Sequence, residues 1–193
     1  GNEIASQASA RAACLLTRAR TKPALMELVQ ETYDCIKEIE VLLDESLELQ
    51  QCGSVTIASS DSSLKGLEAL EEAATRFGIP NERISRERVK ELLPWIESDA
   101  VDVALYMPTD AFIDSALLCS GYARAAAKLG VELKPNCKVK EIIVEQDEIR
   151  GVSLVNGERL NAPIVVNAAG SWANLLMRPL KVGLPFTPVR SHF

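Results

Sequence analysis

Residues 162–172 read Ala-Pro-Ile-Val-Val-Asn-Ala-Ala-Gly-Ser-Trp. The first half is a continuous apolar run with β-branched residues, which is typical of a strand buried on both faces of a parallel sheet. The second half ends in small residues before a helix expected over residues 171–177. Small residues at Ala168, Ala169 and Gly170 suit a backbone that passes close to a ligand, because larger side chains would fill the ligand's space.

An antiparallel excursion precedes this run. Strands are expected over residues 131–133, 137–144, 149–155 and 158–160. The last two flank Asn156-Gly157, and Asn-Gly between two alternating runs is the strongest short hairpin signal. The sequence therefore predicts a three-stranded antiparallel insertion directly before the buried strand.

The first half of the chain alternates helices with strands. Apolar residues recur at helical spacing from Pro23, so a long helix is expected to end before Cys52-Gly53. Further elements are expected as follows: a strand at 53–59, a helix capped by Asp61 or Ser62 that runs to Gly78, a short helix from Ser85 to Pro94, a strand at 101–107, and a helix at 115–129 capped by Asp114. The small residues of this last helix would let it lie close on a sheet.

Composition narrows the function classes. The 193 residues are 47% hydrophobic and 25% charged, as in an ordinary globular protein, and no apolar run is long enough to span a membrane. The net charge of -6 disfavours nucleic acid as a partner. The five cysteines contain no CxxC pair, which predicts no zinc site and a reducing, cytoplasmic environment. Asp99, Asp102 and Asp110 lack the spacing of a metal site and suit turns and caps better.

Four short motifs occur in an informative order. Residues 6–13 read Ser-Gln-Ala-Ser-Ala-Arg-Ala-Ala, and residues 107–114 read Met-Pro-Thr-Asp-Ala-Phe-Ile-Asp. They are followed by Lys138-Val139 and by residues 188–191, Pro-Val-Arg-Ser. Together with the elements from Asp110 to Trp172, this order resembles the FAD-dependent D-amino acid oxidase, glycine oxidase and sarcosine oxidase family. In that family the four motifs correspond to a loop along the cofactor, a "P-x-D-G-x-V-D-P" link, a strand beside the adenine, and a "P-V-R-G" return.

The chain also departs from the family's pattern. None of its ten glycines forms the G-x-G-x-x-G turn that holds the cofactor's pyrophosphate at a helix N-terminus. The resemblance places that turn in a preceding segment of about 30 residues, so the chain alone is expected to bind FAD weakly or not at all. Ala111 stands where the link usually has glycine, and Ser115 stands where it usually has proline.

The resemblance implies a mixed α/β (α+β) fold. Residues 1–45 and 112–181 would form part of a Rossmann-like FAD-binding domain that carries the antiparallel excursion. Residues 46–111 and 182–193 would form part of a β-sheet substrate domain. The cofactor-binding residues would be Ser9, Arg11, Ala12, Val139, Ala168, Ala169, Gly170 and Trp172. Four of these residues also have a simpler interpretation: a polar loop for Ser9 and Arg11, a helix-start glycine for Gly170, and ordinary packing for Trp172.

The function implied is oxidation of a C–N bond in a small amine or amino acid, by hydride transfer to the flavin. No catalytic residue is predicted, and His192 lies too near the end of the chain to be held as a general base. Two alternatives stay open: a flavin-dependent dehydrogenase of a hydroxy acid or glycerol phosphate, and a non-catalytic α/β binding module. Exposed apolar surface around a partial cofactor domain could also mediate oligomerisation.

Overall fold

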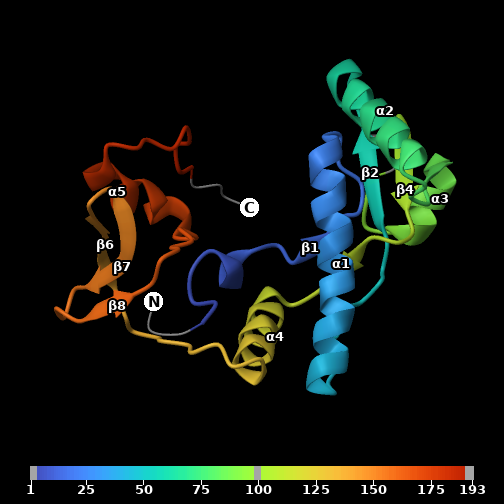
Figure 1. Ribbon diagram of the computed structural model, residues 1–193. Helices are drawn as coiled ribbons and strands as arrows, with labels where there is room; N and C mark the ends of the chain where they lie inside the picture. Colours follow the sequence, from blue (N-terminus) through green and yellow to red (C-terminus); the bar gives the residue numbers. More distant parts are fainter. Residues whose placement is uncertain (1–3, 98–100, 190–193) are drawn as a thin grey trace. The chain divides into compact units, whose positions relative to one another are not determined.

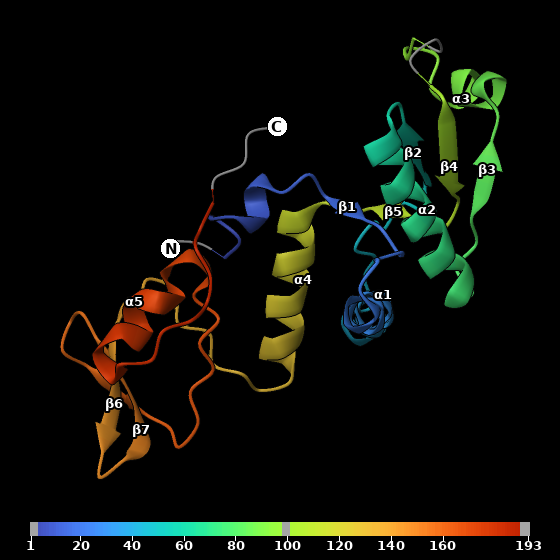
Figure 2. The ribbon, with the colours of Figure 1, turned by 90° about the horizontal axis from the view of Figure 1, so that it is seen from above.

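A computed structural model describes residues 4–97 and 101–189 of the chain. Asp99, His192 and the end of the Pro188–Ser191 motif lie outside these residues. The chain divides into two compact units between Leu133 and Lys134. Figures 1 and 2 show the elements of both units, and each unit is described by itself.

A three-stranded antiparallel sheet lies in the first unit, which precedes Lys134. Its strands are β2 (Ser54–Ala58), β4 (Val103–Met107) and β3 (Glu82–Ile84), in the order β2-β4-β3. Helix α2 (Asp61–Arg76) packs against β2 and β4, and α3 (Arg86–Leu92) contacts β4.

The central strand of this sheet carries two apolar faces. Leu105 and Met107 join a core cluster with Leu67 of α2, whereas Ala104 joins a second cluster with Val89 of α3. Successive side chains of a strand point to opposite faces. Strand β4 is therefore covered on both sides.

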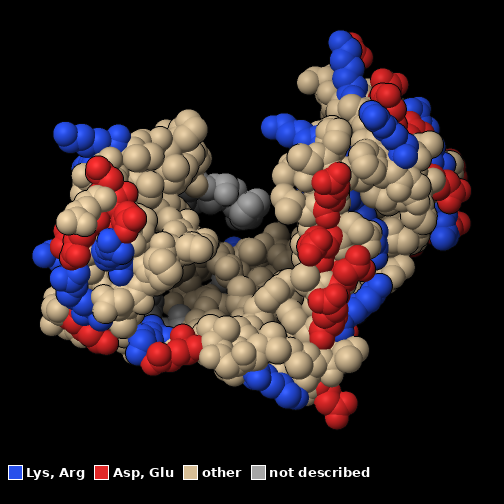
Figure 3. All heavy atoms as spheres, in the orientation of Figure 1, with Lys and Arg blue, Asp and Glu red and all other residues tan. Residues whose placement is uncertain are grey.

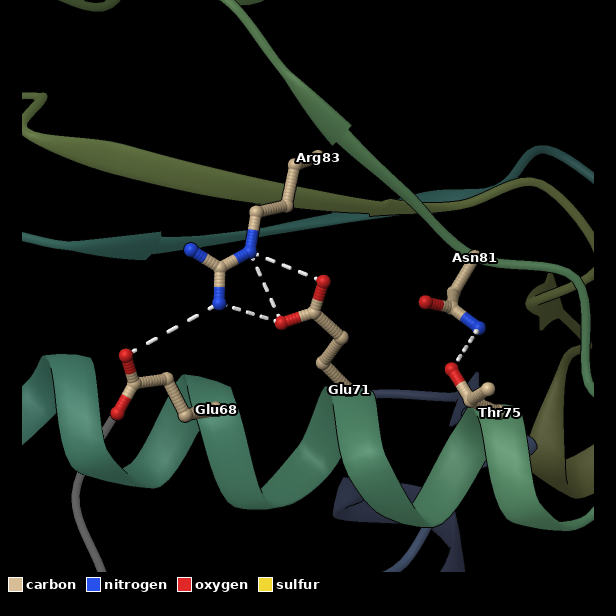
Figure 4. Close-up of polar contacts among 5 residues, drawn as sticks. All are labelled: Glu68, Glu71, Thr75, Asn81 and Arg83. Atoms are coloured by element: carbon tan, nitrogen blue, oxygen red, sulfur yellow. Dashed lines mark hydrogen bonds and ion pairs between the residues drawn. The ribbon is translucent and has the colours of Figure 1, made fainter.

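An ion pair ties α2 to the edge strand β3 (Figure 4). Arg83 Nη2 lies 2.5 Å from Glu71 Oε2 and 4.0 Å from Glu68 Oε1, and Asn81 Nδ2 lies 3.3 Å from Thr75 Oγ1. The hydrogen bond from Arg83 lowers the pKa of the Glu71 carboxyl. The Arg83 and Glu71 side chains are 47% and 28% exposed, so solvent screening limits what the pair adds to stability.

A helix pair completes the first unit. Helix α1 (Pro23–Leu43) packs against α4 (Ser115–Lys128), and both views show them side by side (Figures 1 and 2). Their shared core contains Ile36, Ile39 and Ala125. The expectation that α4 lies on a sheet is therefore wrong, because its small residues allow close contact with α1 instead.

Helix α1 ends earlier than the apolar spacing predicted. Asp44 has a left-handed backbone with φ 56°, and its N–H donates to the carbonyl of Glu40. This closes the helix after Leu43. Leu47 is fully buried in the same core, but it reaches that position from the following loop. The predicted extension to Cys52 is wrong because loop residues can continue an apolar stripe.

Acidic side chains gather along α1 (Figure 3). Its exposed residues include Glu27, Glu31, Asp34 and Glu38. This stripe is the solvated face of the helix, and its charge repels polyanions.

The second unit contains the predicted antiparallel excursion. Strands β6 (Val139–Glu145), β7 (Glu148–Leu154) and β8 (Arg159–Asn161) form one sheet in sequential order. Gln146 and Asp147 both have positive φ, as a two-residue hairpin turn requires. At the next turn the Glu158 N–H donates to Asn156 Oδ1. The hairpins and the mixed α/β class are confirmed.

The buried parallel strand expected over residues 162–170 does not form in the described part of the chain. Residues 162–169 belong to no strand, and Ile164 and Val166 are 78% and 84% exposed. A doubly buried strand needs a hydrogen-bonded neighbour at each edge and cover on both faces, and the described residues supply neither. Residues 131–133 are likewise a loop and not a strand. The helix expected next is present as η3 (Gly170–Trp172) and α5 (Ala173–Met177).

Candidate cofactor site

The first group of predicted site residues lies on a tight turn at the N-terminus of α4. Ser9 and Arg11 form the short 3-10 helix η1 (Ser9–Arg11), and Ala12 closes it by donating its N–H to the Ser9 carbonyl at 3.1 Å. The Ser115 hydroxyl, at the start of α4, donates to the same carbonyl. Ser9, Arg11 and Ala12 are all exposed, so the turn presents a cation and solvent-accessible backbone to a ligand.

The chain leaves this turn through a small sheet. Strand β1 (Leu15–Leu16) pairs with β5 (Ala111–Phe112), and the Ile113 N–H donates to the Cys14 carbonyl at 3.1 Å. The two ends of residues 9–14, called loop 9–14 below, are therefore both bonded to residues 111–115.

A buried carboxylate joins this small sheet to the larger one. Asp110 is 2% exposed. Its Oδ1 accepts the Arg18 N–H at 2.7 Å, and its Oδ2 accepts the Ser54 hydroxyl at 2.6 Å. The sequence predicted only a turn or capping role for Asp110 and missed this bridge, although an aspartate between two apolar strand signals was a usable indication.

Arg18 also contacts the segment around Asp110 that joins the two sheets, and Tyr33 contacts Arg18. The Arg18 guanidinium lies 3.7 Å from the centre of the Tyr33 ring, and its Nε donates to the Thr109 carbonyl at 3.2 Å. The Tyr33 hydroxyl donates to the Leu16 carbonyl at 2.7 Å. Burial raises the pKa of Tyr33, which favours its neutral, donating form.

The second group of predicted site residues lies in the other unit, around Asn167. The Asn167 side chain accepts the Ala169 N–H at 3.2 Å and donates to the Ala173 carbonyl at 3.1 Å. These bonds shape the turn that contains Ala168 and Gly170. Asn167 was named in the motif but not as a site residue, and its role as a turn former was missed.

The outer side of this turn is open. Gly170 has φ +52°, and no protein atom lies within 4 Å of the position that a Cβ would occupy. Ala168 is exposed, Trp172 is 55% exposed, and Val139 is half-buried at the start of β6.

These features fit the parts of a dinucleotide. An exposed arginine suits an anionic diphosphate, and an uncovered backbone with side chains no larger than methyl suits close approach of a planar ring. The structure brings Ser9, Arg11 and Ala12 together in one unit. Ala168, Ala169, Gly170 and Trp172 lie together in the other unit. Among the described residues no cluster of three or more His, Cys, Asp or Glu side chains could hold a metal ion. No helix in residues 4–97 or 101–189 is long and apolar enough to cross a membrane.

Comparison with known proteins gives these features a context. Mouse mitochondrial sarcosine dehydrogenase is 30% identical over 187 residues, which cover 93% of this chain and 20% of that protein. The mitochondrial pyruvate dehydrogenase phosphatase regulatory subunit of mouse is 31% identical over 121 residues, covering 63% of this chain and 14% of that protein. The crystal structure of L-proline dehydrogenase from P. horikoshii superposes with a TM-score of 0.80 at 25% identity, over 90% of this chain and 46% of that one.

The chain thus spans about a fifth or less of the length of these curated relatives. The family described as FAD dependent oxidoreductase matches residues 1–193, the whole chain. This confirms the resemblance drawn from the four motifs. The chain belongs to the FAD dependent oxidoreductase family.

Proposed function

We propose that the protein oxidises a C–N bond of a small amine or amino acid and transfers the hydride to FAD. The observation that carries the proposal is the family match over the whole chain. Two similar proteins are named for sarcosine and L-proline, both of which are secondary amines that carry a carboxylate. Secondary amino acids are therefore the substrates to test first.

Bound FAD would supply the hydride acceptor, and this chain's residues would hold and orient it. Arg11 would pair with the diphosphate, while Ser9 and Ala12 would offer backbone beside it. Val139 would lie at the adenine, and the exposed turn at Ala168, Ala169, Gly170 and Trp172 would allow close approach of the cofactor. We assign no catalytic residue to the chain.

We assign the cofactor and the substrate to the two domains predicted from the sequence. Residues 1–45 and 112–181 would serve the cofactor, and residues 46–111 and 182–193 would serve the substrate. In this proposal the boundary between the two compact units, at Leu133 and Lys134, falls within the part that serves the cofactor. The five cysteines are free, which supports a reducing, cytoplasmic environment.

The direct test is anaerobic reduction of the flavin in the full-length protein. The purified protein is mixed with sarcosine or L-proline without oxygen, and bleaching of the visible flavin bands is followed. We expect bleaching with these amines and none with a 2-hydroxy acid or glycerol phosphate. Bleaching only with the hydroxy compounds would favour the alternative dehydrogenase.

A matched pair of variants tests the cofactor turn. Arg11→Gln removes the exposed cation, and Arg88→Gln removes an arginine paired with Glu91 at 2.7 Å on α3. We expect the Arg11 variant to lower FAD affinity about tenfold, and the Arg88 variant to leave FAD affinity unchanged. Equal affinities in both variants would remove Arg11 from the site.

A second candidate function is regulatory. It is favoured by the similarity to a protein named as a phosphatase regulatory subunit. In this case the full-length protein would keep the fold of the flavoenzyme family and bind a partner protein, without oxidising an amine. Stoichiometric FAD that no amine or hydroxy acid reduces, or a colourless protein, would support this candidate.

A further inference from the structure

Ser115 occupies an unusual place in the link between the two predicted domains. It stands where the link motif usually carries proline, which has no hydroxyl group, and it is the first residue of α4. Its own helix is capped by Asp114, whose Oδ1 accepts the N–H groups of Ala116 and Leu117 at 2.7 and 3.0 Å. The Ser115 hydroxyl is therefore not needed as a helix cap.

The hydroxyl instead makes hydrogen bonds with loop 9–14. It donates to the Ser9 carbonyl and accepts the Cys14 thiol at 3.5 Å. One side chain thus contacts the first and the last residue of the loop. The thiol also lies 3.3 Å from the Ala12 carbonyl, so the three loop residues form one hydrogen-bonded group with Ser115.

Apart from Ser115, loop 9–14 is held by backbone hydrogen bonds, among them the one from the Ile113 N–H to the Cys14 carbonyl. Helix η1 has three residues and no side-chain cap, and so short a 3-10 turn is marginal without tertiary contacts. Cys14 has φ 63°, a left-handed conformation that costs energy in a residue with a Cβ. Contacts with α4 must offset both.

We infer that Ser115 is a positioning residue for the cofactor: its hydroxyl holds loop 9–14 in the turn that presents Arg11 and Ala12 to FAD. The inference rests on the proposed function, because it assigns loop 9–14 to the cofactor. Removing the hydroxyl leaves the Ser9 carbonyl with the Ala12 N–H alone and leaves the Cys14 thiol with the Ala12 carbonyl alone. Part of the free energy of FAD binding is then used to order the loop, so FAD binds more weakly.

The test compares Ser115→Ala with Ser115→Thr in the full-length protein, with Ser120→Ala, further along α4, as the matched control. FAD affinity is measured by quenching of flavin fluorescence, and the flavin's surroundings are followed by visible circular dichroism. We expect Ser115→Ala to weaken FAD binding about threefold to tenfold, the range of one hydrogen bond, and to change the dichroism. Ser115→Thr should restore both, and Ser120→Ala should match the wild type.

A second measurement follows the loop without the cofactor. Alkylation of Cys14, quantified by peptide mass spectrometry, should be faster in Ser115→Ala than in the wild type, because the thiol has lost its contact with α4 and keeps only the one within the loop. If the alanine variant does not fold, the isosteric pair Ser115→Thr and Ser115→Val gives the same comparison.

The outcomes separate the two claims. Wild-type protein that binds FAD, together with a Ser115→Ala variant of equal affinity and equal dichroism, overturns the role of Ser115 alone. Wild-type protein that takes up no FAD overturns the proposed function and this inference with it.

Discussion

Oδ1 of Asp110 lies 2.7 Å from the backbone nitrogen of Arg18, a residue 92 positions away in the sequence. The same carboxylate accepts the Ser54 hydroxyl. Asp110→Asn replaces one acceptor oxygen with an amide donor, so either the Arg18 N–H loses its partner or the Ser54 hydroxyl must rotate from donor to acceptor. We expect a loss of about 1–3 kcal/mol in the free energy of unfolding, measured by urea titration. Asp102→Asn, at an exposed position on the same stretch, should change it by less than about 0.5 kcal/mol.

Tyr33 makes the first unit sensitive to alkali. Burial raises the pKa of its hydroxyl in the folded state, so the unfolded chain releases this proton first as the pH rises. The stabilisation is complete below the unfolded pKa of about 10 and is lost as the pH rises through the higher folded value. Tyr33→Phe should abolish this share of the alkaline loss of stability and cost about 1 kcal/mol at neutral pH, because the bond to the Leu16 carbonyl disappears.

Burial raises the pKa of Tyr122 as well, so Tyr122→Phe measures the share of that second hydroxyl. Urea titrations at neutral and alkaline pH compare the variants. An unchanged alkaline slope in Tyr33→Phe would contradict the assignment.

Gly151 lies on β7 where the neighbouring strand β8 leaves no room for a side chain. A Cβ at this position would lie 1.9 Å from the Leu160 carbonyl oxygen, and the backbone has φ +137°. Gly151→Ala must therefore separate β7 from β8, at a cost of about 3 kcal/mol or more. Faster hydrogen exchange at the amides of both strands would report it.

Gly66 provides the opposite case. It lies inside α2, and nothing occupies the space of an added Cβ. Gly66→Ala should stabilise the helix by about 0.5–1 kcal/mol. A destabilised Gly66→Ala variant would mean that α2 is not helical at this position.

The exposed apolar run at Ile164 and Val166 should make the 193-residue chain self-associate. Unpaired extended backbone with apolar side chains favours pairing between chains. Sedimentation velocity over a concentration series should show oligomers that Ile164→Lys or Val166→Lys disperses. Val41→Lys, at a site 83% exposed on α1, should leave the oligomers unchanged. A chain that is monomeric at every concentration would rule out this surface.

Local chemistry explains which elements were predictable. Ser85 and Asp114 cap their helices through side-chain bonds, and Asn156-Gly157 turns its hairpin, because each signal acts within a few residues. The N-cap of α2 is Ser60, one residue before Asp61 and two before Ser62, the two caps that were predicted. The prediction of a buried strand at residues 162–170 was wrong, because a strand needs hydrogen-bonded neighbours and apolar composition does not supply them.

The candidate site was predictable only in part. The residue types around Ser9 and Gly170 were recognisable from their motifs. The contacts that shape them, from Ser115 and Asn167, depend on tertiary geometry or on side-chain rotamers. Sequence spacing alone could not give the 106-residue separation between Ser9 and Ser115.

That separation has a consequence for how the protein is made. Ribosomal synthesis proceeds from the N-terminus, so loop 9–14 emerges long before its bonding partners at residues 111–115 exist. Closing so long a stretch is slow, because chain entropy must be lost before any contact forms. The loop is therefore among the last parts of its unit to be ordered, and the nascent chain is open to proteases there until the first turn of α4 has left the ribosome.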